Sequence, residues 1–259
     1  MSLPEINKVF DIKGKVALIT GATGGFGVIA CKTMAAAGAK VMATGRGEDK
    51  LKPLVDELKA AGAEAAYSVG SPDKHEDVKK VAQDTVDKFG GIDILITAAG
   101  MNKVGPIVDQ PVEDWEAVIN ANLKGTYLFC KEAGRVMIAQ GRGGKAILVS
   151  SARGNLGMAN YTGYSPSKAA VNLLTKSLGC EWGPHKINVN AIAPTVFRTA
   201  LTQWMFDDDA FYKNFLRRIP LGRLGEPEDF VGLLIFLASS ASDFMTGAII
   251  DIDGGYAAG

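Results

Sequence analysis

The sequence predicts an α/β protein with a Rossmann-type, doubly wound parallel sheet of about seven strands, flanked by helices on both faces. Two observations predict this fold. Short runs of apolar and β-branched residues alternate with helical periods along the whole chain, and these runs are continuously apolar, which is typical of strands buried on both faces. No linker or repeat interrupts the alternation, so residues 1–259 are predicted to form a single domain.

The predicted strands and helices alternate from the start of the chain to its end. Ile29–Ala37, for example, has apolar and small residues at helical spacing. Strand–helix alternation of this kind requires right-handed crossovers between parallel strands. Thr195–Leu216 departs from the alternation and is interpreted as an irregular insertion. The predicted strands are Val16–Thr20, Lys40–Thr44, Ala65–Ser68, Ile92–Thr97, Ala146–Ser150, Ile187–Ala193 and Ile249–Ile252.

Composition argues against several classes of partner. The 28 basic residues balance the 28 acidic ones, which argues against nucleic acid or an anionic membrane as the main partner. The longest apolar run, Phe230–Ala238, is far shorter than the roughly 20 residues of a membrane span, and the first residues do not resemble a signal peptide. Cys31, Cys130 and Cys180 are predicted to be reduced, packed thiols of a cytoplasmic protein.

No metal site is expected from the sequence. His75 and His185 are isolated in polar stretches and are interpreted as ordinary surface residues.

A glycine-rich loop, Thr20-Gly-Ala-Thr-Gly-Gly-Phe-Gly27, joins the first predicted strand to a helix. Gly21, Gly25 and Gly27 allow a tight turn and a close approach of the backbone to a pyrophosphate at the helix N-terminus. A glycine cluster can also be a tight turn and nothing more. The strand–loop–helix context favours a dinucleotide site.

Tyr164 and Lys168 are four residues apart, so a helix places them on one face with Cβ atoms about 6 Å apart. A lysine cation beside a phenol is expected to lower the pKa of the phenol. Ser151 follows a predicted strand directly, and its hydroxyl can hold a substrate oxygen. The three side chains are those needed to move a proton on and off a carbonyl oxygen.

From about residue 12 to residue 256 the chain resembles the short-chain dehydrogenase/reductase family. The resemblance rests on the glycine loop, on Thr97-Ala-Ala-Gly100 after the fourth strand, on Asn122, on Ser151, on the Tyr164/Lys168 pair and on Asp253-Gly-Gly255. It implies a Rossmann-type fold, a nicotinamide cofactor and a homotetramer or homodimer.

The resemblance also implies roles for individual residues. Tyr164 would be the acid/base, Lys168 would favour the phenolate and bind the nicotinamide ribose, Ser151 would hydrogen-bond the reacting oxygen, and Asn122 would hold a water that relays protons. Ser71 and Thr195 depart from the family, which usually has Asp and Gly there. The implied cofactor contacts are Gly21, Thr23, Gly25, Phe26, Gly27, Arg46, Ala99, Gly100, Tyr164, Lys168, Pro194, Phe197 and Thr199.

The end of the second strand bears on the choice of nicotinamide. An NAD binder commonly has Asp or Glu there for the ribose 2′-hydroxyl, whereas an arginine accommodates a 2′-phosphate. Gly45 supplies no carboxylate, and Arg46 supplies a cation with Lys50 close behind. NADP(H) is therefore favoured over NAD(H). The alternative reading makes Arg46 a solvated loop charge.

The insertion at about 195–216 is predicted to close over the substrate as a lid. Its apolar side chains either form a wall of the substrate pocket or pack the lid onto the sheet or a second subunit. Arg153 and Arg198 are candidates for contacts with an anionic group of the substrate. The apolar side chains are Phe197, Leu201, Trp204, Met205, Phe206, Phe211, Tyr212 and Phe215.

The sequence thus predicts an NADP(H)-dependent oxidoreductase that interconverts a ketone and a secondary alcohol, on a 3-oxoacyl thioester, an oxoacid or a sugar acid. Three alternatives remain open at this point. They are an NAD-dependent secondary-alcohol dehydrogenase, a non-catalytic cofactor-binding protein of the same fold, and a nucleotide-sugar epimerase or dehydratase.

Overall fold

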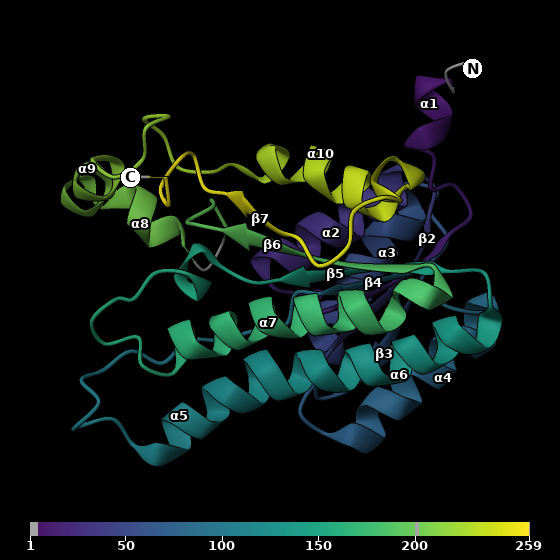
Figure 1. Ribbon diagram of the computed structural model, residues 1–259, viewed down its shortest axis with the longest axis horizontal. Coiled ribbons are helices and arrows are strands. Elements are labelled where there is room, and N and C mark those ends of the chain that lie inside the picture. Colours follow the sequence, from purple (N-terminus) through teal and green to yellow (C-terminus); the bar gives the residue numbers. More distant parts are fainter. Residues whose placement is uncertain (1–4, 200–201, 259) are drawn as a thin grey trace.

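The order of the strands places a ligand crevice at one edge of the sheet. The computed structural model describes residues 5–199 and 202–258. In that part of the chain, parallel strands form one sheet in the order β3-β2-β1-β4-β5-β6-β7 (Figure 1). The chain leaves β1 towards β2 and β3 and then returns to the other side of β1 with β4. In open α/β sheets, ligands bind at such a reversal, outside the carboxyl ends of the strands.

The predicted fold is confirmed, with strand boundaries that differ by one or two residues. Two predicted strands, Val16–Thr20 and Ile249–Ile252, have the predicted bounds. The strands are β1 Val16–Thr20, β2 Lys40–Gly45, β3 Ala65–Val69, β4 Ile94–Thr97, β5 Gly144–Val149, β6 Ile187–Pro194 and β7 Ile249–Ile252. The helices are α1 Ile6–Val9, α2 Gly25–Ala36, α3 Glu48–Ala60, α4 His75–Phe89, α5 Val112–Ile119, α6 Gly125–Gln140, α7 Tyr164–Trp182, α8 Gln203–Asp207, α9 Asp209–Leu216 and α10 Pro227–Ala238. Short turns complete the set: a π turn η1 Asn120–Lys124 and the 3₁₀ turns η2 Ala152–Gly154, η3 Gly183–His185 and η4 Ser240–Ser242.

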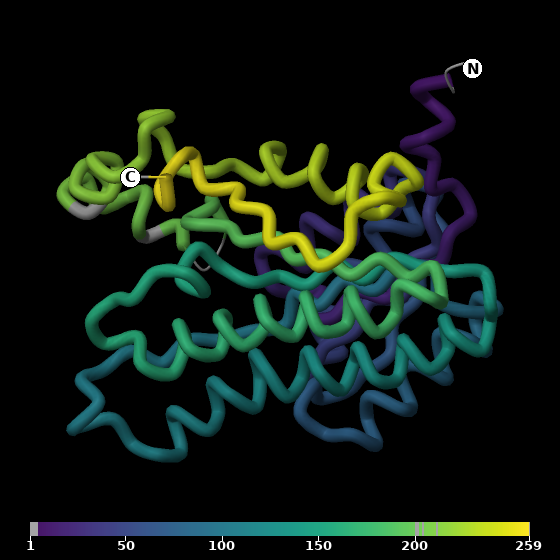
Figure 2. The backbone as a smooth tube through the Cα atoms, viewed as in Figure 1, coloured from purple at the N-terminus to yellow at the C-terminus, as the bar shows by residue number. Residues whose placement is uncertain are grey.

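Helices cover both faces of the sheet, so the molecule has three layers, with a hydrophobic core on each face of the sheet. Helices α2, α3 and α10 lie on one face and α4, α6 and α7 on the other (Figures 1 and 2). Successive side chains of a strand point to opposite faces, so Ala17 and Ile19 enter the first core and Leu18 the second. The predicted burial on both faces holds for the central strands. It is wrong at the edges, where Ala66 and Tyr67 of β3 are half-buried and Asp251 of β7 is exposed.

The three cysteines differ in their surroundings. Cys31 and Cys130 are buried, and burial raises the pKa of each thiol to about 12. Cys180 is exposed on α7, so its predicted packing is wrong. It lies on a face of the helix that the sheet does not cover.

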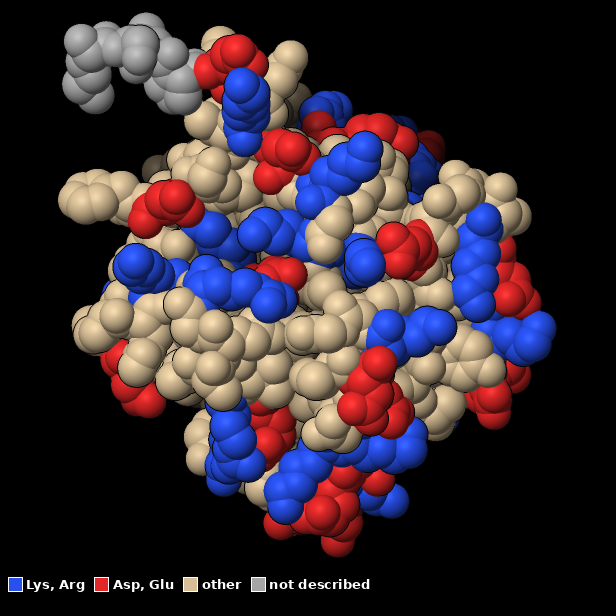
Figure 3. All heavy atoms as spheres, turned by 90° about the vertical axis from the view of Figure 1, so that its right-hand side faces the viewer, with Lys and Arg blue, Asp and Glu red and all other residues tan. Residues whose placement is uncertain are grey.

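Positive and negative side chains are interspersed on the side of the molecule that Figure 3 shows, where the chain enters the strands. Within residues 5–199 and 202–258, no helix has the length and apolar character needed to cross a membrane.

Candidate active site

The glycine loop after β1 packs against the segment after β4, across the point where the strand order reverses. Gly21 has a φ of +58°, and a Cβ there would lie 2.6 Å from the backbone of Ala99. The backbone N–H of Ala99 donates to Oγ1 of Thr20 at 3.2 Å. A Cβ at Gly27 would lie 2.0 Å from the carbonyl oxygen of Gly21. Side chains at these glycines would close the space that the loop leaves at the start of α2.

A cavity of about 500 Å³ opens above this loop. The ends of the first four strands line it, including Gly21, Thr23, Arg46, Ala99 and Gly100 from the expected cofactor contacts. Gly25 and Phe26 are not part of its lining. A glycine-lined cavity at a helix N-terminus fits the pyrophosphate of a dinucleotide, because free backbone N–H groups favour anions there.

The polar groups of the cavity fit the ribose and adenine end of such a cofactor. Among the described residues, Oγ1 of Thr44 is buried without a hydrogen-bond partner, and this residue lines the cavity. Arg46 is exposed at its rim and makes none of the ion pairs of the described residues. Ser71, which replaces the family's aspartate, donates from its hydroxyl to Asp73 at 2.5 Å. This bond lowers the pKa of Asp73 and places a carboxylate in the cavity close to the serine.

Asn122 is fully buried at a π turn between α5 and α6. Its Oδ1 accepts from the N–H of Met101 at 2.8 Å, and its Nδ2 donates to the carbonyl oxygen of Met101 and to Oγ of Ser167, both at 3.0 Å. Asn122 thus ties the end of β4 to α7. Turns of the π type are frequent at functional sites.

Tyr164, Lys168 and Ser151 meet at the carboxyl ends of β4, β5 and β6. Tyr164 opens α7, and Nζ of Lys168 lies 5.8 Å from the centre of its ring. Lys168 is 5% exposed and donates from Nζ to the carbonyl oxygen of Val149 at 2.8 Å. A Cβ at Gly100 would lie 3.6 Å from this Nζ and 3.2 Å from Oδ1 of Asn122. The backbone of Gly100 therefore lies between the cavity, which it lines, and the side chains of Lys168 and Asn122.

Two hydrogen bonds from Ser150 hold α7 in register against the end of β5. Its hydroxyl contacts Oδ1 of Asn172 at 2.5 Å and the carbonyl oxygen of Lys168 at 3.2 Å. Ser151 itself is 7% exposed, and its hydroxyl accepts from the backbone N–H of Arg153 at 3.1 Å.

Burial, rather than the lysine, decides the proton affinity of the tyrosine. Burial raises the pKa of Tyr164, and its hydrogen bond with Ser151 and the charge of Arg153 oppose that rise only in part. The expected lowering by Lys168 is therefore wrong for the protein without cofactor. Burial also lowers the pKa of Lys168 to about 8, so its cation is itself disfavoured.

The segment after β6 carries the other expected cofactor contacts. The carbonyl oxygen of Pro194 lies 3.5 Å from the hydroxyl of Ser151. Phe197 is 3% exposed and packs edge-on against Phe26, with ring centres 5.4 Å apart. Thr199 packs on the glycine loop, where a Cβ at Gly25 would lie 2.3 Å from its Cγ2.

The predicted irregular insertion contains two helices, α8 and α9. Phe206, Tyr212 and Phe215 pack against a small cluster of buried residues formed by Ala152, Ile219, Leu224 and Tyr256. Leu201 lies outside the described residues, as do the side chains of Trp204 and Phe211. The position of Phe197 beside Phe26 and Phe230 assigns it to the core, not to the wall of a pocket.

Arg198 and Arg153, the two candidates for an anionic substrate group, differ in their partners. Arg198 forms an ion pair with Glu226 at 3.0 Å, and its guanidinium lies 3.9 Å from the ring centre of Phe206. Arg153 donates instead to the hydroxyl of Tyr256 at 2.5 Å. Sequence reasoning missed Tyr256, which the family motifs do not mark.

His75 is not an isolated surface residue. Its Nε2 lies 2.6 Å from Oε1 of Glu132, which is 5% exposed and also accepts from Arg135. Within the described residues, no group of three or more His, Cys, Asp or Glu side chains has the arrangement of a metal site. Asp93 is a sheet-end group, since it accepts from the N–H of Val16 and from Arg142.

A second cavity, of about 780 Å³, lies at the opposite edge of the sheet. Arg142 and Lys145 line it, but they are paired with Asp93 and Asp243 at 2.8 and 2.7 Å. The first cavity, at the carboxyl ends of the strands, is the better candidate for a ligand site. There the Thr44 hydroxyl has no hydrogen-bond partner, and Arg46 makes none of the ion pairs of the described residues.

Residues 21–257 match the family described as enoyl-(acyl carrier protein) reductase. The chain belongs to the short-chain dehydrogenase/reductase family. Members of this family are NAD(P)-dependent oxidoreductases that act on CH–OH and C=O groups.

Three relatives span nearly the whole chain. An uncharacterised oxidoreductase of Mycobacterium tuberculosis is 47% identical over 255 residues, which are 96% of this chain and 93% of the relative. The 3-oxoacyl-[acyl-carrier-protein] reductase of Thermotoga maritima is 37% identical and covers 94% of this chain and 98% of its own length. A crystal structure of a gluconate 5-dehydrogenase from Burkholderia cenocepacia, in complex with NADP and tartrate, has a TM-score of 0.94 at 33% identity, covering 98% of this chain and 100% of that one.

Proposed function

We propose that the protein is an NADP(H)-dependent oxidoreductase that interconverts a secondary alcohol and a ketone by hydride transfer. The observation that carries this proposal is the meeting of Tyr164, Ser151 and Lys168 behind Gly100, at the edge of the glycine-lined cavity. The reaction needs a proton donor next to the place where a hydride arrives, and this arrangement supplies one.

The cavity residues would hold the cofactor. Gly21, Gly25 and Gly27 would bring the backbone to the pyrophosphate, and Arg46 would contact the 2′-phosphate. Thr23, Phe26, Ala99, Gly100, Pro194, Phe197 and Thr199 would complete the contacts, with Tyr164 and Lys168 at the nicotinamide end. When bound, the nicotinamide supplies or accepts the hydride.

Tyr164 gives its proton to the carbonyl oxygen in the reductive direction and takes it back in the oxidative one. Its raised pKa keeps the phenol protonated at neutral pH, which suits the donor role in reduction. The Ser151 hydroxyl hydrogen-bonds the same oxygen as negative charge develops on it. Lys168 lies close enough to stabilise the phenolate once Tyr164 has lost its proton.

Asn122 keeps the end of β4 and the start of α7 in place through its bonds to Met101 and Ser167. We also propose that a water bound next to Asn122 returns the proton through Lys168. Membership of the family supports this role.

A carboxylate-bearing alcohol or ketone is the substrate class that we propose. The gluconate 5-dehydrogenase relative and the arginine beside Ser151 support this class. A 3-oxoacyl thioester is a second candidate, favoured by the 37% identity to the Thermotoga maritima reductase. The lid of about 195–216 would cover either substrate.

NADP(H) is proposed over NAD(H) because β2 ends at Gly45, which supplies no carboxylate, and Arg46 follows it. The NADP complex of the Burkholderia cenocepacia relative agrees with this choice. A homotetramer or homodimer in the cytoplasm is the proposed working form. Light scattering after gel filtration measures the assembly.

The test is a screen of nicotinamide absorbance with NADPH and NADH across neutral ketones, oxoacids, 3-oxoacyl thioesters and sugar acids. Reduction of at least one class with NADPH, and its loss in Tyr164→Phe, is the expected result. Absence of turnover with every class, combined with normal cofactor binding, would favour the non-catalytic alternative.

A further inference from the structure

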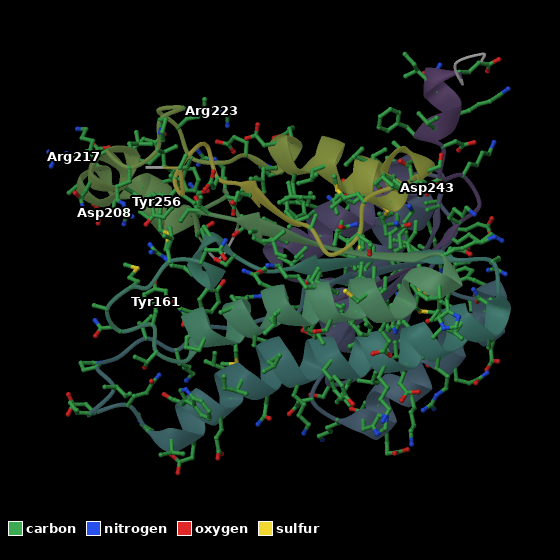
Figure 4. The ribbon with its side chains drawn as sticks, viewed as in Figure 1. Tyr161, Asp208, Arg217, Arg223, Asp243 and Tyr256 are labelled. Carbon is green, nitrogen blue, oxygen red and sulfur yellow. The ribbon has the colours of Figure 1, made fainter. Side chains whose placement is uncertain are left out.

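Tyr256 lies in the segment after β7 and is 2% exposed. Its ring stacks on Phe215 of α9, with centres 5.3 Å apart and planes 7° apart. It belongs to the small apolar cluster with Ala152, which follows Ser151 directly. Figure 4 shows Tyr256 between the lid helices and the rest of the molecule. One buried ring thus connects the lid, the C-terminal segment and the turn that carries the catalytic serine.

Two guanidinium groups lie on this ring. Arg153 donates from Nη2 to the Tyr256 hydroxyl at 2.5 Å, and its Cζ lies 5.2 Å from the ring centre. Cζ of Arg218 lies 4.4 Å from the same centre. Arg153 and Arg218 therefore both make cation–π contacts with the Tyr256 ring.

Neither Arg153 nor Arg218 takes part in the ion pairs of the described residues, unlike other arginines of the same region. Arg198 is neutralised by Glu226 at 3.0 Å, and Arg223 by Asp229 at 2.6 Å. Both cations lie within 5.2 Å of the same ring centre and repel each other, and the hydrogen bond to Tyr256 holds Arg153 in place. An anion bound to both would offset this repulsion.

Arg153 lies next to the reacting groups. The backbone N–H of Arg153 donates to the Ser151 hydroxyl at 3.1 Å, so its side chain starts two residues from the proposed contact with the substrate oxygen. The charge of Arg153 also acts on Tyr164, whose pKa it lowers against the larger effect of burial. A group bound by Arg153 would therefore belong to the molecule whose oxygen meets Tyr164.

We propose that Arg153 and Arg218, held on Tyr256, bind a carboxylate of the substrate and thereby select hydroxy acids and oxo acids over neutral alcohols and ketones. The inference rests on the proposed function and specifies its substrate class. A carboxylate accepts two parallel N–H bonds from a guanidinium, which fixes orientation as well as affinity. Tyr256 acts through Arg153 as a positioning residue.

The test compares substrates that differ only in the carboxylate. D-gluconate is paired with D-sorbitol, and 3-hydroxybutyrate with butane-1,3-diol, each with NADP⁺ and the purified protein. KM and kcat are measured for wild type, Arg153→Ala, Arg218→Ala and Tyr256→Phe. Binding of each compound to the NADP⁺-loaded protein is measured by calorimetry, which gives a readout independent of turnover.

We expect KM and the dissociation constant for the acids to rise about 10- to 100-fold in Arg153→Ala, the effect of losing a charge-assisted hydrogen bond. The KM and the dissociation constant for the neutral compounds should change little. Arg218→Ala should act in the same direction. Tyr256→Phe keeps the ring and removes only the hydroxyl, so it should raise KM for the acids and leave kcat and thermal stability nearly unchanged. Arg217→Ala, a substitution of the neighbouring exposed arginine on the outer side of the lid, is the matched control (Figure 4).

The outcomes separate this inference from the proposed function. If wild type turns over secondary alcohols while the arginine variants affect acids and neutral compounds equally, the carboxylate site is wrong and the oxidoreductase stands. If wild type binds an acid through Arg153 without turning it over, the site stands and the proposed reaction on that acid fails. Failure of wild type to bind either acid overturns the site.

Discussion

The Nζ atom of Lys168 lies 2.8 Å from the carbonyl oxygen of Val149, the last residue of β5. This bond fixes the cation of α7 to the edge of the sheet, while the ring of Tyr164 lies 5.8 Å away on the same helix. The lysine is thus positioned by the strand and the tyrosine by the helix. Their separation depends on the register of α7 against β5, which the Ser150 bonds fix.

Replacement of Tyr164 by Phe tests the proton donor. The substitution removes the hydroxyl that would protonate the carbonyl oxygen and leaves the ring in place. We expect turnover to fall by about 10²- to 10⁴-fold, the usual contribution of a positioned acid/base. NADPH binding, measured by fluorescence titration, should stay within a few-fold of wild type. Near-normal turnover would remove Tyr164 from the mechanism.

Substitution of Arg46 by Ala tests the choice of nicotinamide. The exposed guanidinium would lose its contact with the 2′-phosphate, so the dissociation constant of NADPH should rise about tenfold while that of NADH stays constant. Lys52→Ala is a suitable control, because Lys52 lies on α3 and is already paired with Asp56 at 2.8 Å. Equal effects of Arg46→Ala on both cofactors would contradict the assignment.

Gly27→Ala tests the packing of the glycine loop. Its Cβ would lie 2.0 Å from the carbonyl oxygen of Gly21, so the loop must move. We expect the free energy of unfolding to fall by about 1–3 kcal/mol, as for other overpacked sites. Gly183→Ala has open space around its Cβ and a φ of −51°, and should change stability by less than about 0.5 kcal/mol. Urea unfolding of the two variants and wild type, without cofactor, measures the difference.

The buried lysine predicts a pH dependence of stability. Burial lowers the pKa of Lys168 from its ordinary value of 10.5 to about 8 in the folded protein, so between these values the unfolded chain binds more protons. Stability from this residue therefore rises with pH across that window and is lowest below pH 8. Lys168→Met removes the titration.

Urea unfolding of wild type and Lys168→Met at pH 7 and at pH 10 isolates this effect, since the other titrating groups are shared. The stability of wild type relative to the variant should increase by up to about 3 kcal/mol at the higher pH. A constant difference between the two proteins would show that Lys168 titrates normally in the folded state.

How far the sequence predicts this site depends on the distance along the chain between the partners. Tyr164 and Lys168 are neighbours on one helix, so their spacing alone predicted that they meet. The direction of the Tyr164 pKa was wrong because it depends on burial, which no local pattern shows. The arginine on Tyr256 could not be predicted, since 103 residues separate the two.

The expectation that strands are buried on both faces is correct for the central strands and wrong for the two edge strands, although the edge strands themselves were predicted. The apolar runs of β1 and β4 have one explanation, burial in the middle of a sheet. At β3 and β7 the same kind of run lies at an edge. The helices of the 195–216 segment were missed because aromatic residues dominate its sequence, whereas α9 forms with Tyr212 and Phe215 packed on the Tyr256 cluster.

The π turn at Asn120–Lys124 makes this stretch of the chain sensitive to length. A helix turns by about 100° per residue, so deletion of one residue that restored a regular α-helix would rotate α6 relative to α5 by that angle. Asn122 would then leave Met101, and the face of α6 that covers β4 would turn away from the sheet. Descendants of this chain can exchange residues in this segment far more readily than they can lose one.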